Sequence, residues 1–89
     1  MPDRDALLDG LHEHLAATAE LPVERDASRW IGEAEAVAAD LAGSDLPAGT
    51  VRERVGHVRD LLAEVEETGH PAADDHVERA RKLCQRLLD

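Results

Sequence analysis

Aromatic side chains are almost absent from this sequence, which has no phenylalanine or tyrosine and one tryptophan, Trp30. Because no run of alternating β-branched or aromatic residues occurs either, strands are not predicted. No stretch approaches the roughly 18 continuous apolar residues that a membrane span requires. The start, MPDRDALLDG, is charged and no apolar run follows it. We therefore expect no signal peptide, no membrane partner and a cytoplasmic location.

Cysteine and lysine occur once each, as Cys84 and Lys82. A single thiol cannot form an internal disulfide, and on its own it is not a zinc site. The chain has 89 residues, so we expect one domain spanning residues 1–89. Its large apolar residues are mainly twelve leucines and seven valines. A core of that size supplies only about 3–5 kcal/mol, and small scaffolds often gain further stability from a partner subunit.

Positive charge is also scarce, because twenty acidic residues oppose ten basic ones and nine of those ten are arginine. The resulting net charge of −10 exceeds the roughly 2–8 charges that are usual for a small domain. Repulsion between so many like charges destabilises the compact state unless salt screens it. At 1 M salt the screening length is about 3 Å. The composition therefore predicts a halophilic protein built for molar salt, rather than an ordinary acidic one. It argues against nucleic-acid binding, which needs clustered Lys and Arg.

Helical periodicity is the feature that the sequence does contain. Apolar residues repeat every three or four positions in four segments, and we expect helices at about residues 3–19, 22–42, 50–68 and 71–88. A repeat averaging 3.5 residues matches near-antiparallel packing at about 20°, and short connections favour antiparallel neighbours. The sequence therefore predicts an all-α, up-down antiparallel four-helix bundle. The alternative is a three-helix core whose remaining helix packs on another chain.

Several residues mark the expected helix ends. Pro22 and Pro71 suit the first position of a helix, where a missing N–H costs nothing. Thr50 and Glu53 have the spacing of a capping box, and Gly69 fits a left-handed C-terminal cap. Each helix should bury one stripe of side chains. The predicted stripes are Leu8, Leu11, Leu15 and Thr18; Val23, Ala27, Trp30, Ala34, Val37 and Leu41; Val51, Val55, Val58, Leu62 and Val65; and Ala73, Val77, Ala80, Cys84 and Leu87.

Gly32 is unexpected inside a helix, where glycine costs about 1 kcal/mol relative to alanine. It points about 200° away from Trp30, toward a side of the second helix that carries other small residues. Small residues let another backbone approach closely, and nearby arginines suit the rim of an interface. The alternative is that these positions are solvated and the glycine has no special role. The predicted interface, with a second copy as a homodimer or with another protein partner, consists of Arg25, Ser28, Arg29, Gly32, Ala36 and Ala39.

The five histidines are the natural candidates for a metal site, but their spacing does not favour one. His12 and His14 are two positions apart on a helix and diverge. His70 and His76 flank Asp74 and Asp75, and acids in a first helical turn are already explained by the helix dipole. These spacings miss the usual zinc patterns, so we predict no metal ligand.

Acidic four-helix enzymes give a second comparison. Glu64 and Glu67 match half of the paired-glutamate motif of all-α nucleotide pyrophosphohydrolases, but no second pair follows. Glu67 and His70 have the Glu-x-x-His spacing of di-iron bundles but run through the expected stop at Gly69. We therefore predict no catalytic, cofactor-binding or metal-binding residue. A weak metal site near Glu64, Glu67, His70 or His76 stays open.

Two stretches, ELPVERDASRWIGEAEAVAADL and VRERVGHVRDLLAEVEETG, resemble a family of small acidic proteins from halophilic archaea that is classed as a domain of unknown function. The resemblance covers nearly the whole chain and implies no activity, cofactor or catalytic residue. Because no catalytic group was found, we expect a non-enzymatic protein–protein interaction or oligomerisation module. The alternative is a small acidic-bundle enzyme that uses a divalent metal and a phosphate-containing substrate.

Overall fold

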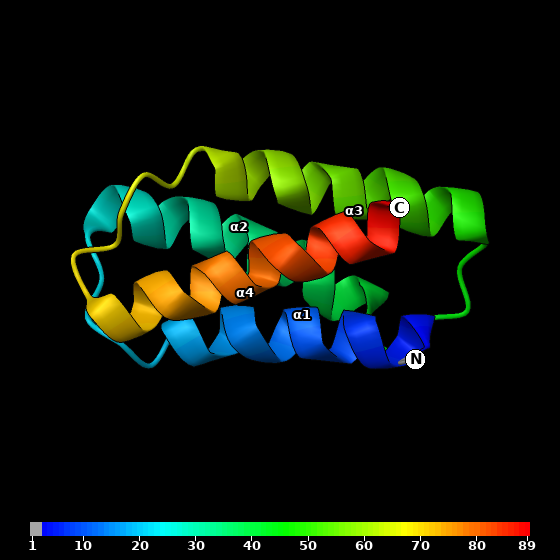
Figure 1. Cartoon of the computed structure of the whole chain (residues 1–89), viewed down its shortest axis with the longest axis horizontal. Coiled ribbons are helices and arrows are strands. Elements are labelled where there is room, and N and C mark those ends of the chain that lie inside the picture. The colour runs from blue at the N-terminus through cyan, green and yellow to red at the C-terminus, as the bar shows by residue number, and fades with distance from the viewer. Residues whose placement is uncertain (1–2) are drawn as a thin grey trace.

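A computed structural model describes residues 3–89, which form four α-helices joined by loops (Figure 1). Each helix packs on two neighbours, because α1 contacts α2 and α4, and α3 contacts the same two helices. The predicted all-α four-helix bundle is confirmed, and no helix is left outside it. None of the helices in the described range is long and apolar enough to cross a bilayer. The helices are α1 (Arg4–Thr18), α2 (Arg25–Leu41), α3 (Ala48–Ala63) and α4 (Pro71–Leu88).

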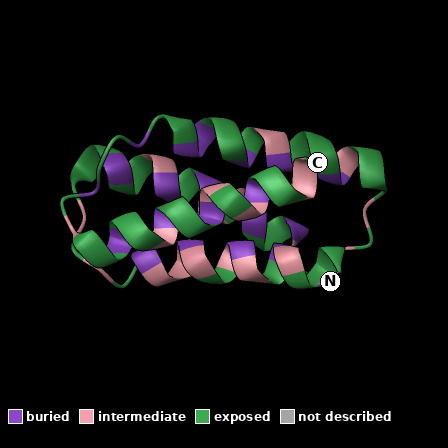
Figure 2. Ribbon diagram, viewed as in Figure 1, coloured by how far each residue is buried: buried purple, intermediate pink, exposed green. Residues whose placement is uncertain are grey.

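The core lies along the inward side of all four helices, as the buried positions in Figure 2 show. The predicted stripes of α1, α3 and α4 are buried, except that Leu87 is only half-buried. Leucine fills the core from α1, valine from α3, and mainly alanine and Cys84 from α4. α1 and α4 pack closely at Gly10 of α1, where an added Cβ would lie 3.4 Å from the Leu83 side chain of α4.

The stripe of α2 differs from the predicted one by a small rotation. Ile31 and Ala38 are buried, whereas Trp30 and Val37 are half-buried and pack against the core from its edge. Periodicity cannot separate positions 30 and 31 when both are apolar, because a shift of one residue leaves the three-and-four spacing intact. Trp30 is therefore an edge residue of the core with part of its ring accessible.

Two of the three helices that were expected to start at sequence signals start elsewhere. α2 begins at Arg25 rather than at Pro22, because the preceding backbone is extended and the Glu24 N–H donates to the Thr68 carbonyl at 2.8 Å. α3 begins at Ala48, directly after Pro47, so the capping box predicted at Thr50 does not form. In contrast, α4 begins at Pro71 as predicted.

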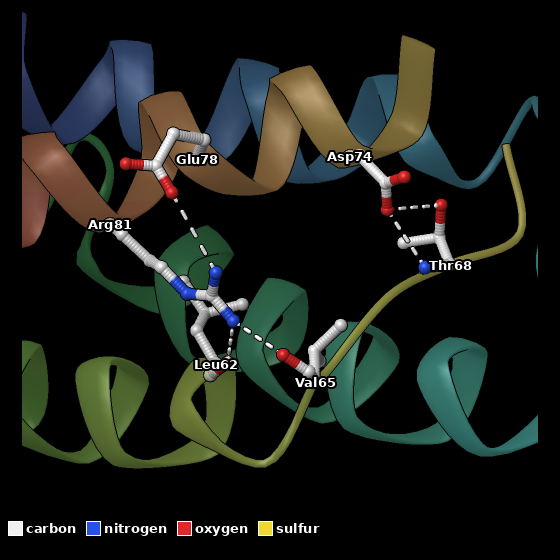
Figure 3. A network of polar contacts seen from close by, with 6 residues as sticks. All are labelled: Leu62, Val65, Thr68, Asp74, Glu78 and Arg81. Carbon is white, nitrogen blue, oxygen red and sulfur yellow. Dashed lines mark hydrogen bonds and ion pairs between the residues drawn. The ribbon is translucent and has the colours of Figure 1, made fainter. Parts of the chain in front are cut away.

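The end of α3 is the largest difference from the expected boundaries. The helix stops at Ala63 instead of residue 68, and the following backbone turns across the end of the bundle. Arg81 of α4 explains the stop, because its Nη2 donates to the carbonyl oxygens of Leu62 at 2.7 Å and Val65 at 2.5 Å (Figure 3). A cation that takes the last carbonyls of a helix satisfies groups with no partner inside the helix. Gly69, with φ +81°, turns the segment toward α4.

Candidate functional site

Trp30 lines a cleft of about 430 Å³ between the first turns of α2 and the segment that follows α3. The side chain is partly buried against the core, and its accessible part faces the cleft. The cleft exists because α2 starts late and α3 ends early, so that two non-helical segments meet at this end of the bundle. Its lining residues are Glu24, Asp26, Ala27, Arg29, Trp30, Glu64, Val65, Glu66 and Glu67.

The one cation of this lining already lies on its one aromatic ring. The guanidinium carbon of Arg29 is 5.2 Å from the centroid of the Trp30 ring, which is within the range of a cation–π contact. Such a contact is worth about 0.5–1 kcal/mol at an exposed site. Arg29 was predicted as a rim residue of an interface, and it also belongs to the wall of the cleft.

The charge of the cleft is strongly negative, because five carboxylates face one guanidinium. A concave surface of one sign focuses the field and concentrates ions of the opposite sign. However, no three His, Cys, Asp or Glu side chains within residues 3–89 lie close enough together to hold a metal ion. The cleft can therefore attract cations electrostatically, but it has no preformed coordination shell.

Glu64 and Glu67 both belong to this cleft, although neither lies where the sequence placed it. Glu64 is the C-terminal cap of α3, and Glu67 is in the loop beyond it. Two glutamates on one face of a helix could share a metal ion, but these two are not within a helix. The half-match to a pyrophosphohydrolase motif is thus not reproduced in the backbone.

Of the four histidines that were weighed as ligands, two meet across the bundle. His14 of α1 and His76 of α4 approach to 2.9 Å between their Nδ1 atoms. His70 has a different role, because its Nδ1 accepts from the Ala72 N–H at 3.2 Å and so caps α4. Asp75 is bound by Arg79 at 2.9 Å, as its spacing of four residues on a helix suggests.

Thr68 is the hub of the loop that leads into α4 (Figure 3). Its N–H donates to Oδ1 of Asp74 at 2.8 Å, and its hydroxyl lies 2.8 Å from the same oxygen. The hydroxyl also accepts from the His70 N–H at 3.1 Å. These bonds to the ionised form, first of all the backbone one, lower the pKa of the Asp74 carboxyl below its usual 3.8. Thr68 is fully buried, so it anchors the loop to the bundle.

All six residues of the predicted interface are exposed on α2: Arg25, Ser28, Arg29, Gly32, Ala36 and Ala39. A Cβ added to Gly32 would meet no atom within 4 Å. No neighbouring helix therefore requires a glycine at this position, and the small residues beside it are not packing positions of the bundle itself.

Cys84 is buried in the core, as predicted from its place on the stripe of α4. Burial raises the pKa of its thiol to about 11, and the positive charge of Arg59 opposes this shift only partly. The reactive form of cysteine is the thiolate, so this side chain is inert near neutral pH.

Sequence reasoning missed the pairing of His14 with His76 and the roles of Arg81 and Thr68. Both histidines flank an apolar stripe, which places each near a helix–helix boundary but does not say which helices meet. Nothing in the spacing of Arg81 distinguishes it from the solvated arginines of the same helix. Its partners are backbone carbonyls of another helix, and a side-chain pattern does not reveal such partners.

No curated protein and no solved structure matched the chain. One family did match, over residues 7–89, and it is described as a domain of unknown function (DUF8152). This match covers nearly all of the chain and confirms the expectation of a domain of unknown function. The chain belongs to the DUF8152 family.

Proposed function

We propose that this chain is a non-enzymatic helical interaction module of a halophilic archaeal cytoplasm, and that it forms a homodimer through the outer face of α2. The contact surface would consist of the six exposed residues from Arg25 to Ala39 described above. Because a twofold contact uses the same patch on both subunits, one self-complementary helix face is sufficient to form it.

The observation that carries the proposal is Gly32. A glycine in the middle of an exposed helix costs about 1 kcal/mol relative to alanine. A Cβ at this position would meet no atom of the bundle within 4 Å, so packing inside the chain does not require the missing side chain. Close approach of a second backbone supplies a reason that the isolated chain lacks.

The charge pattern of α2 favours a second copy in antiparallel orientation. Arg25 lies about two helical turns before Gly32, and Asp40 lies about two turns after it. Both are exposed, and neither has an ion-pair partner within residues 3–89. If two α2 helices pack antiparallel with their Gly32 residues in contact, each Arg25 lies opposite the Asp40 of the other copy. The net charge of −10 per chain opposes association, and molar salt reduces this repulsion to about a 3 Å range.

Absolute mass by light scattering across a range of protein concentrations, in about 2 M potassium chloride, tests the proposal. We expect a dimer for the natural sequence and a monomer for Gly32→Leu, because a leucine keeps the two backbones apart. Gly49→Leu is the matched control, since a Cβ at Gly49 also meets nothing within 4 Å but lies on α3. A monomer at every concentration, or a dimer that tolerates Gly32→Leu, would contradict the proposal.

The orientation of the two copies has its own test. At a lower salt concentration of roughly 0.5 M, Arg25→Glu alone and Asp40→Arg alone should each weaken the dimer by repulsion. The double variant restores opposite charges across the contact and should regain affinity. If the double variant is no tighter than the single ones, the two residues do not meet and the antiparallel arrangement is wrong.

The acidic cleft supports the alternative function, an enzyme that uses a divalent metal and a phosphate-containing substrate. Glu64 and Glu67 lie in the same cleft as three other carboxylates, which would attract a divalent cation. Trp30, the one tryptophan, borders this cleft, so its fluorescence should respond to a cation that binds there. A saturable change on adding magnesium or manganese, reversed by chelator and lost in Glu64→Gln/Glu67→Gln, would favour the enzyme. Unchanged Trp30 fluorescence on adding either metal would count against the enzyme and favour the interaction module.

A further inference from the structure

The contact between His14 and His76 joins α1 to α4 through two imidazole rings. Their Nδ1 atoms are 2.9 Å apart, the ring centroids are 5.2 Å apart, and the planes are tilted by 45°. Both side chains are half-buried. A nitrogen–nitrogen distance of 2.9 Å is that of a hydrogen bond, in which one nitrogen carries the proton and the other offers a lone pair.

At this distance, one of the two Nδ1 atoms can carry a hydrogen, but both cannot do so without repulsion. The pair can consist of two neutral rings, or of one imidazolium and one neutral ring, because either leaves one Nδ1 as an acceptor. When both rings are cations, both Nδ1 atoms carry hydrogens that point at each other, and two positive charges stand at the same short distance. The hydrogen bond is then replaced by repulsion.

The charges that act on His14 come from its own helix and from α4. Glu13 on α1 and Asp75 on α4 favour its charged form, whereas His76 and Arg79 on α4 oppose it. Asp75 is itself bound by Arg79, which offsets much of its attraction. Burial is the largest influence, and together these lower the pKa of His14 below 6.5.

We propose that His14 and His76 are a pH-sensitive link between α1 and α4, which holds the helices together while the rings share one proton and opens when both rings are charged. The link affects the stability of the bundle because it lies between α1 and α4, and α1 packs more extensively on α4 than on any other helix. Opening it frees the side of α1 that carries the leucines of the core.

The direction of the pH dependence follows from the lowered pKa. The folded state holds the His14 proton less tightly than the unfolded chain does, so the stability contribution is complete above about pH 6.5. It is lost as the pH falls through the folded-state pKa of His14. An ordinary exposed histidine would contribute no slope in this range.

Thermal unfolding in about 2 M potassium chloride, between roughly pH 7.5 and 5, tests the link, with chelator present so that no metal ion can bridge the rings. We expect the Tm of the natural sequence to fall by at least about 4 °C more than that of His14→Gln/His76→Gln. Each single glutamine variant should also flatten the curve. The control is His57→Gln, which removes an exposed histidine of α3 and should keep the full slope.

Ring-nitrogen chemical shifts give a readout that does not depend on the stability of the variants. At about pH 7 we expect one Nδ1 of the pair to be protonated and the other to be a bare acceptor. The proposal is overturned if both Nδ1 atoms carry protons in an intact bundle at low pH. It is equally overturned if the natural sequence and the double variant lose stability in parallel.

Discussion

The backbone N–H of Glu24 donates to the backbone carbonyl of Thr68 at 2.8 Å, and this bond joins two loops that are more than forty residues apart in sequence. It forms at the end of the bundle where α1 leads into α2 and α3 leads into α4 (Figure 1). Because the bond is made by main-chain atoms, it depends on the path of both loops and not on the identity of either side chain.

Replacing Arg81 should lengthen or fray α3 and destabilise the bundle. Arg81→Ala removes a charged donor from two carbonyl oxygens, and hydrogen bonds from charged groups are worth about 1.5–3 kcal/mol. We expect a loss in this range by chemical denaturation, and a smaller loss for Arg81→Lys. Arg79→Ala is the control, because it breaks only an exposed ion pair worth about 0.3–0.5 kcal/mol. Equal effects of the two alanine variants would show that the carbonyl contacts contribute nothing.

Gly69 and Gly43 offer a matched pair of alanine substitutions. Both have positive φ, at +81° and +76°, so alanine costs about 1–2 kcal/mol in either place. At Gly69 the new Cβ would also lie 3.1 Å from Cγ of Glu24, whereas at Gly43 it meets nothing. We therefore expect Gly69→Ala to lower the free energy of unfolding more than Gly43→Ala. The excess should disappear in a Glu24→Ala background, and its persistence there would exclude the contact as the cause.

Asp74 should stabilise the fold only while it is ionised. Its pKa is lowered by the bonds from Thr68, so its contribution is present above the ordinary value of 3.8 and is lost as the pH falls through the folded-state pKa. Asp74→Asn should be less stable than the natural sequence at neutral pH, and the gap should narrow in acid. Asp75→Asn, which removes the same charge without contacting Thr68, is the control. A gap that stays constant down to about pH 3 would contradict this account.

Cys84 should resist thiol reagents in the folded protein. With a pKa of about 11, only about one thiol in a thousand is ionised near pH 8, and the side chain is fully buried. We expect labelling by a disulfide reagent to be slow in the native state and to become fast in denaturant, as followed by release of the coloured thiol. Rapid native labelling would mean that α4 opens locally far more often than the rest of the bundle.

The sequence predicts the helices well where their own residues determine them, and less well where other segments do. The buried stripes of α1, α3 and α4 follow from periodicity, because each helix offers only one apolar side. The rotation of α2 between Trp30 and Ile31 does not, since the two apolar neighbours compete and the space left by the other helices decides between them. Likewise, the early end of α3 depends on Arg81, a residue of the next helix.

The candidate sites likewise include features that a helix's own residues determine and features that depend on other segments. The exposure of Gly32 and its small neighbours follows from helical geometry alone. The cleft beside Trp30 depends on where two helices begin and end, which the local signals at Pro22 and Gly69 place incorrectly by several residues. The contact of His14 with His76 depends on which helices are neighbours and at what height, and neither is encoded in the spacing of either residue.

The bonds that join the loops make the two ends of the bundle unequal. One end is held by Glu24, Thr68, Asp74 and Arg81. The other end consists of the first turn of α1, the last turn of α4 and a connection from α2 to α3 whose Ser44 bonds only back to Leu41 (Figure 1). We expect amide hydrogens to exchange fastest in the first turns of α1 and the last turns of α4. Unfolding should therefore start at this less tightly bonded end, and the leucines that lie there would be exposed to water first.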